Sequence, residues 1–157
     1  YIIPEGGASE LGVQGAAKIL EGIDQSQFDY IICAGGTGTT IAGLVCAAEA
    51  NTKVIGMAVL KGAKWMSEDV QVWLDKLKCH NSNWEINTDY HFGGYAKQTA
   101  ELRSFIASVN HEQNLPLDPI YTGKAFYGLL DLIEKGKIEK GSRILFIHTG
   151  GLQGARS

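Results

Sequence analysis

The sequence predicts an α/β protein with a mainly parallel sheet and helices on both faces, a three-layer αβα arrangement. Apolar runs of strand length alternate with segments of helical periodicity along the whole chain. Strands separated by helices require crossover connections, which make neighbouring strands parallel and bury both faces of the sheet. No linker, internal repeat or low-complexity stretch divides the 157 residues, so we expect a single α/β domain over residues 1–157.

The elements follow one another in a regular order. Serine residues that precede two of the apolar helical patterns, Ser9 and Ser67, are the N-cap candidates. The predicted helices are residues 9–22, 39–50, 66–78, 97–112 and 124–136. The predicted strands are residues 1–7, 28–34, 53–60, 83–88 and 142–151.

Composition narrows the possible partners. A hydrophobic content of 45% with 20% charged residues is typical of a soluble globular domain. The net charge of −3 and the lack of a Lys/Arg cluster argue against nucleic acid, and no segment resembles a membrane span or a leader. We therefore expect a small-molecule ligand, with neither nucleic acid nor membrane as a partner.

The three cysteines lack the spacing of a metal site, so no metal is predicted. Cys33 and Cys46 lie in apolar runs, which favours buried free cysteines, and Cys79 is expected on a surface segment. An odd number of cysteines without a secretory signal fits a reducing compartment, so the expected location is the cytoplasm.

The segment "CAGGTGTTIAGL" carries the strongest functional signal. Glycines allow the backbone to approach a ligand closely, and the N-terminus of the following helix favours an anion. The dinucleotide fingerprint fails because Ile41 stands where Gly or Ala is needed, and no Gly-Lys-Ser/Thr follows. The alternative is an unusual turn without a ligand. We favour a bound anion, with phosphate as the expected group, because three threonine hydroxyls on one turn have no packing purpose.

Several segments together resemble one enzyme family. They are "PEGGASELGVQG", "CAGGTGTTIAGL", "HFGGYAK", "LDPIYTGKAFYGL" and "IHTGGLQG". They resemble the D-cysteine desulfhydrase and 1-aminocyclopropane-1-carboxylate (ACC) deaminase group of enzymes, which have the tryptophan-synthase-β-like fold, or fold type II. The resemblance implies pyridoxal 5′-phosphate as the cofactor. It also implies that one loop holds the cofactor's phosphate, formed by Gly36, Thr37, Gly38, Thr39 and Thr40.

The same resemblance assigns roles to three further residues. Thr149 matches the residue whose hydroxyl faces the pyridine nitrogen, and Tyr95 and Tyr121 match the tyrosines on the substrate side of the ring, where we expect them to be catalytic. A hydroxyl does not force protonation of the nitrogen as a carboxylate does, and the resulting weaker electron sink suits β-elimination. The alternative without a catalytic role is that Tyr95 and Tyr121 are aromatic residues that serve only in packing, and that Thr149 is an ordinary hydroxyl at the end of a strand.

The resemblance also separates the two activities. The deaminases carry a glutamate where this chain has Thr122, and they lack a threonine at the position of Thr149. Both differences favour a desulfhydrase acting on a small amino acid such as D-cysteine. The alternatives that remain open are an ACC deaminase and a non-catalytic phosphate- or nucleotide-binding domain.

The lysine that binds the cofactor in this family belongs to a Gly-Asn-Lys motif in the N-terminal half, and this sequence has no such motif. Four lysines lie near predicted loops, but none matches the family's context: Lys61, Lys64, Lys97 and Lys124. We therefore expect the chain to be the C-terminal part of a longer enzyme. We expect this part to be inactive alone and the full-length protein to be a homodimer.

Overall fold

The computed structural model describes residues 2–151, and its regular elements form one sheet and two layers of helices. The helices are α1 (Glu10–Ala17), α2 (Thr39–Ala47), α3 (Trp65–Lys76), α4 (Ala100–Gln113) and α5 (Thr122–Glu134). The strands are β1 (Tyr30–Gly35), β2 (Lys53–Ala58), β3 (Trp84–Asn87) and β4 (Ile144–Ile147). Short 3₁₀ turns occupy η1 (Glu5–Gly7), η2 (Lys18–Leu20) and η3 (Gln25–Gln27).

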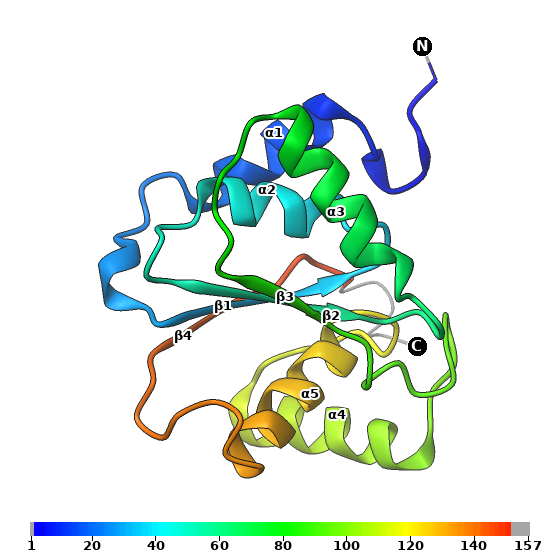
Figure 1. Ribbon diagram of the computed structural model, residues 1–157. Helices are drawn as coiled ribbons and strands as arrows, with labels where there is room; N and C mark the ends of the chain where they lie inside the picture. The colour runs from blue at the N-terminus through cyan, green and yellow to red at the C-terminus, as the bar shows by residue number, and fades with distance from the viewer. Residues whose placement is uncertain (1, 152–157) are drawn as a thin grey trace.

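The sheet confirms the predicted α/β class. Its four strands have the order β3-β2-β1-β4, and every neighbouring pair is parallel. Helices α1, α2 and α3 cover one face, and α4 and α5 cover the other (Figure 1). No helix within residues 2–151 has the length and apolar character needed to span a bilayer.

Strand β1 shows why the sequences of the central strands are continuous apolar runs. Successive side chains of a strand point to opposite faces of the sheet. Ile31 and Cys33 accordingly belong to the core beneath α1, α2 and α3. Ile32 and Ala34 belong to the core that contains the buried residues of α5. Since both faces are covered, every position along the strand needs an apolar side chain.

Helix ends follow local capping chemistry at two positions. Ser9 caps α1 as predicted, because its hydroxyl accepts a hydrogen bond from the Gly12 amide at 3.1 Å. Thr99 does the same for α4, accepting from the Leu102 amide at 3.1 Å. The prediction for Ser67 was wrong: α3 begins at Trp65, so Ser67 already lies inside the first turn.

Residues 1–7 were predicted to form a strand, and for the described residues 2–7 this was wrong. Residues 2–4 are irregular and residues 5–7 form the 3₁₀ turn η1. Ile2 and Ile3 are 90% and 74% exposed, so their apolar side chains are not part of the core. An isolated strand has no ladder to satisfy its backbone groups, which explains why apolar character alone does not produce one.

The expectation of free cysteines was wrong for two of the three. Cys46, at the end of α2, forms a disulfide with Cys79, just after α3. Cys33 is free and buried, and burial raises the pKa of its thiol to about 12. The cysteine pattern therefore no longer supports the expectation of a reducing compartment.

Gly43 permits the close packing of α2 on α1. A Cβ at this position would lie 2.5 Å from the Val13 carbonyl oxygen and 2.6 Å from the Ala16 Cβ. Gly43→Ala is therefore expected to destabilise the fold by about 1–3 kcal/mol through overpacking. Gly15→Ala on α1 is the control: a Cβ there would meet no atom within 4 Å, so helix propensity should stabilise it by about 0.5–1 kcal/mol. Urea unfolding midpoints measure both changes, and equal midpoints would contradict this account of the helix contact.

Candidate functional site

A large cleft lies at the carboxyl ends of β1 and β4. These neighbouring strands connect to opposite faces of the sheet, because β1 leads into α2 on one face and α5 on the other face leads to β4. Ligands of open α/β sheets bind at such a switch point. The cleft has a volume of about 800 Å³. It is lined by Glu5, Gly6, Ala34, Gly36, Thr37, Thr40, Leu60, Trp65, Tyr95, Asp118, Tyr121, Thr149, Gly150 and Gly151.

The loop between β1 and α2 presents a helix N-terminus to this cleft. Gly38 is the N-cap of α2 and has a φ of 80°, a left-handed conformation that favours glycine. The first bond of the helix joins the Ala42 amide to the Gly38 carbonyl, so the amides of residues 39–41 have no partner within the helix. Because Gly38 has no side chain to cap them, these amides are available to an anion.

The predicted threonines divide into two kinds. Thr37 and Thr40 line the cleft, where their hydroxyls can bind a ligand. Thr39 is only 5% exposed, and its Oγ1 lies 3.0 Å from Thr37 Oγ1 in a hydrogen bond. Thr39 can therefore act on a ligand through its amide and by orienting the Thr37 hydroxyl.

The N-terminal turn η1 closes one side of the same loop. A Cβ on Gly6 would lie 2.5 Å from Thr37 Oγ1, so only a glycine allows the turn to approach Thr37 this closely. Gly6, Gly36 and Gly150 all line the cleft. Three glycine-rich segments that are far apart in the sequence thus meet at one place.

Tyr95 and Tyr121 face one another at the cleft. Their ring centroids are 6.3 Å apart at an interplanar angle of 68°, and the Tyr95 side chain is 58% exposed. The Tyr121 ring also lies against Gly36, where a Cβ would be 3.2 Å from Tyr121 Cε1. Burial, followed by the neighbouring Tyr95, raises the pKa of the Tyr121 phenol.

Thr149 lines the cleft directly after β4, which ends at Ile147. The predicted strand over residues 142–151 was too long: β4 covers only Ile144–Ile147, and Gly150 and Gly151 have left-handed φ values of 105° and 85°. His148 Nε2 is 2.8 Å from the Pro116 carbonyl oxygen, and the Gly150 amide donates to His148 Nδ1 at 3.3 Å. These bonds hold the Thr149 segment beside the loop that precedes α5.

Asp118 is a cleft residue that the sequence analysis missed. It is 3% exposed, and its carboxylate accepts four hydrogen bonds. The Ile120 and Tyr121 amides donate to Oδ1 at 2.8 and 2.7 Å, and the Thr122 amide and hydroxyl donate to Oδ2 at 2.8 and 2.6 Å. The carboxylate therefore holds the backbone of Tyr121. The sequence feature that could have identified Asp118 is the Asp-Pro pair just before a helical pattern, which is typical of the start of a helix.

The side-chain hydroxyl of Thr122 makes all its hydrogen bonds to Asp118. Its hydroxyl donates to Asp118 Oδ2 and accepts from the Asp118 amide at 2.9 Å, and the residue is 0% exposed. It therefore cannot reach a ligand in the cleft. By the resemblance, Thr122 stands at the position where the deaminases carry a glutamate. In this structure its side chain shapes the loop that carries Tyr121.

Comparison with known proteins agrees with this architecture. The family model described as "Pyridoxal-phosphate dependent enzyme" matches residues 1–150. A putative ACC deaminase of Pyrococcus furiosus is 41% identical over 98% of this chain and 50% of its own length. A bifunctional D-cysteine desulfhydrase/ACC deaminase of Arabidopsis thaliana, named as mitochondrial, is 38% identical over 98% of this chain and 42% of its own length.

A solved structure shares the fold. The crystal structure of an ACC deaminase homologue superposes with a TM-score of 0.83 at 36% identity, covering 98% of this chain and 50% of that one. The fold and the cleft thus define an α/β protein with a glycine- and threonine-lined cleft at its switch point. The chain belongs to the pyridoxal-phosphate dependent enzyme family, which confirms the predicted family and cofactor. It spans about half the length of the curated relatives it matches.

Thr122 offers a direct test of the Asp118 contacts. Thr122→Val keeps the shape of the side chain but leaves the buried Asp118 amide without its acceptor, so it is expected to cost about 1–3 kcal/mol of stability. Thr122→Ser retains the hydroxyl and should cost less than about 1.5 kcal/mol, the loss of one methyl group. Chemical unfolding measures both variants. A valine variant as stable as the serine variant would show that these hydrogen bonds do not support the loop.

Proposed function

We propose that the full-length protein containing this chain is a pyridoxal-phosphate dependent enzyme that eliminates the thiol of a small amino acid such as D-cysteine. The elimination would release sulfide and aminoacrylate, and water would then hydrolyse the aminoacrylate to pyruvate and ammonia. One observation carries the proposal: a helix N-terminus with free amides, a pair of tyrosines and a strand-end threonine meet in one cleft. Relatives named for deaminase and desulfhydrase activities support this general chemistry.

The residues of the cleft fit the phosphate of this cofactor. Gly36, Thr37 and Thr40 line the cleft beside the N-terminus of α2, where amides and hydroxyls converge on one position. No lysine or arginine belongs to the lining among residues 2–151. A dianion held in this way would be bound by neutral donors and by the helix dipole. Gly38 and Thr39 contribute the backbone geometry and the orientation of Thr37.

Thr149, which also lines the cleft, suits the cofactor's ring. When bound, the cofactor withdraws electrons from the α-carbon of the substrate through its pyridine ring. We assign the Thr149 hydroxyl to the pyridine nitrogen, with which it can exchange a hydrogen bond without forcing protonation. The buried carboxylate of the cleft, Asp118, already accepts four hydrogen bonds and so is not available to stabilise a protonated ring nitrogen.

The two tyrosines suit the proton transfers of an elimination. In this reaction the α-proton leaves the substrate, the Cβ–S bond breaks and the departing sulfur takes up a proton. A tyrosine phenol carries its proton at neutral pH, and the raised pKa of Tyr121 preserves that state, so the phenol can donate a hydrogen bond to the leaving sulfur. Tyr95 lies across from it and is well placed to orient the substrate.

Two other functions are candidates for the same cleft. ACC deaminase activity is the second candidate, because the Pyrococcus furiosus relative carries that name at 41% identity. The buried Thr122 argues for the desulfhydrase, since the deaminases carry a glutamate there. A non-catalytic domain that binds only a phosphate or nucleotide is the third candidate, and it needs neither tyrosine.

Cofactor retention tests the phosphate assignment. In the full-length protein, the double change Thr37→Val and Thr40→Val removes two hydroxyl donors and should weaken cofactor binding by about 10- to 100-fold. Thr88→Val, outside the lining of the cleft, is the matched control and should bind as the parent does. Fluorescence titration with pyridoxal 5′-phosphate measures the dissociation constants. Equal constants for all three proteins would remove the phosphate assignment.

Turnover separates the candidate activities. The full-length protein with its cofactor should show a visible absorption band that borohydride bleaches, and it should release sulfide and pyruvate from D-cysteine. ACC as substrate would instead yield 2-oxobutyrate and ammonia. Faster turnover of ACC would favour the second candidate. A protein without the band and without turnover of either compound would support the non-catalytic domain.

A further inference from the structure

Lys124 is a buried cation outside the lining of the cleft. It belongs to α5 and is 0% exposed. Its ammonium donates to two backbone carbonyl oxygens, that of His91 at 3.0 Å and that of Gly94 at 2.7 Å. Burial lowers the pKa of the amine, and the Asp118 carboxylate opposes this effect. Neither ion pair observed among residues 2–151 involves it, so these carbonyls are its main partners.

The carbonyls belong to a backbone segment that needs external support. Phe92, Gly93 and Gly94 have φ values of 50°, 97° and 118°, three successive residues in left-handed conformations. Glycines adopt such conformations readily, whereas the left-handed conformation of Phe92 persists only where the surroundings hold it. Tyr95, one of the two tyrosines of the cleft, follows directly. Its position therefore depends on what holds this segment in place.

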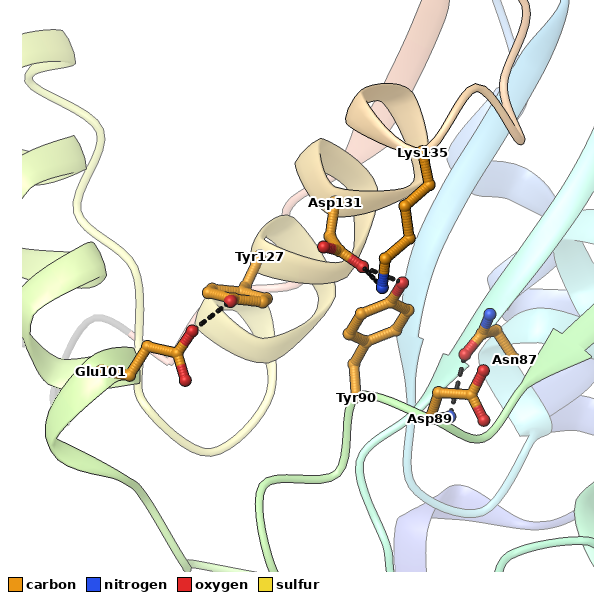
Figure 2. A network of polar contacts seen from close by, with 7 residues as sticks. All are labelled: Asn87, Asp89, Tyr90, Glu101, Tyr127, Asp131 and Lys135. Carbon is orange, nitrogen blue, oxygen red and sulfur yellow. Dashed lines mark hydrogen bonds and ion pairs between the residues drawn. The ribbon is translucent and has the colours of Figure 1, made fainter.

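Two further contacts join the same segment to α5. Tyr90 donates from its hydroxyl to Asp131 Oδ2 at 2.5 Å, and Lys135 Nζ lies 2.6 Å from the same oxygen (Figure 2). The Tyr90 ring packs against Gly128, where a Cβ would come within 2.7 Å of it. Figure 2 shows Tyr90 reaching from its connecting segment to the surface of α5.

Aromatic packing adds to these attachments. The rings of Phe92 and Tyr127 meet edge to face with centroids 5.0 Å apart. Tyr127 in turn donates to Glu101 on α4, as the same view shows. Lys124 is the attachment nearest the cleft, because Gly94 immediately precedes Tyr95.

We propose that Lys124 is a positioning residue that sets the spacing between Tyr95 and Tyr121. Tyr121 is the N-cap of α5, and Lys124 lies three residues later on the same helix. Its bond to the Gly94 carbonyl ties the backbone next to Tyr95 to the helix that begins at Tyr121. A single helical turn thus determines the placement of both tyrosines. The expected effect of Lys124 on catalysis rests on the proposed function, whereas the hydrogen bond between Lys124 and the Gly94 carbonyl does not.

The positioning role of Lys124 is distinct from a contribution to the free energy of unfolding. A buried ammonium loses hydration, and its replacement by an apolar side chain of similar size is often neutral for stability. Each carbonyl also keeps another donor, because the Gly94 amide donates to His91 O at 2.9 Å and the Lys97 amide donates to Gly94 O at 3.1 Å. Removing the ammonium should therefore loosen the segment more than it unfolds the protein.

The test compares Lys124→Met with Lys137→Met, an exposed lysine just after α5, in the full-length protein. Lys124→Met is expected to lower kcat about 10- to 100-fold, the effect of displacing a catalytic group by roughly 1 Å. The dissociation constant of pyridoxal 5′-phosphate should stay within about twofold of the parent value, because Lys124 does not touch the cleft. Amide hydrogen exchange at Gly94 and Lys97 should be about 10-fold faster or more. Lys137→Met should change none of these.

Unchanged kcat and unchanged exchange in Lys124→Met would overturn the proposal. Equal losses of kcat and cofactor affinity would also overturn it, because they indicate general disruption. If the parent protein has no activity, the proposed function fails, and the exchange rates alone then decide whether Lys124 holds the segment. If Lys124→Met does not fold, Lys124→Gln, which loses the charge but keeps a donor at shorter reach, is compared with Lys137→Met in the same way.

Discussion

The free amides at the N-terminus of α2 are the feature on which the site depends. They are free because the left-handed Gly38 caps the helix without a side chain, and they face the cleft because α2 packs on the sheet directly after β1. The partial positive charge of a helix end then falls at the switch point between β1 and β4. Thr37 and Thr40 add hydroxyls at the same place. Phosphate chemistry is thus favoured by backbone geometry, and no lysine or arginine of the described lining is needed.

Helix α5 organises the opposite wall of the cleft with two buried charges of opposite sign. The Asp118 carboxylate collects the amides at the start of the helix and so holds Tyr121. The Lys124 ammonium, in the first turns of the same helix, collects carbonyls of the segment that carries Tyr95. Each charge is satisfied by backbone groups of the opposite polarity, which is the condition for burying it. We infer that these two buried charges position the two tyrosines, Asp118 from within the lining of the cleft and Lys124 from outside it.

Features determined by neighbouring residues could be predicted from the sequence. The apolar runs of β1 and β2, the cap at Ser9 and the Gly-Thr loop are all local signals. The resemblance to a known family, not a local signal, assigned residues 36–40 and Thr149 to one site, and Gly36, Thr37, Thr40 and Thr149 do line one cleft. Features that depend on distant partners could not. The Cys46–Cys79 disulfide joins residues 33 apart, and the partners of Lys124 lie 30 and 33 residues away. The strand predicted at the N-terminus failed for the same reason, since apolar character does not reveal whether a neighbouring strand exists.

The position of a bound cofactor tests the central claim most directly. Crystals of the full-length protein grown with pyridoxal 5′-phosphate would show its phosphorus atom directly. We expect the phosphate at the N-terminus of α2, within hydrogen-bonding distance of Thr37 and Thr40, with the ring nitrogen beside the Thr149 hydroxyl. A phosphate bound elsewhere, with the residue 36–40 loop turned away from the tip of β4, would contradict the claim.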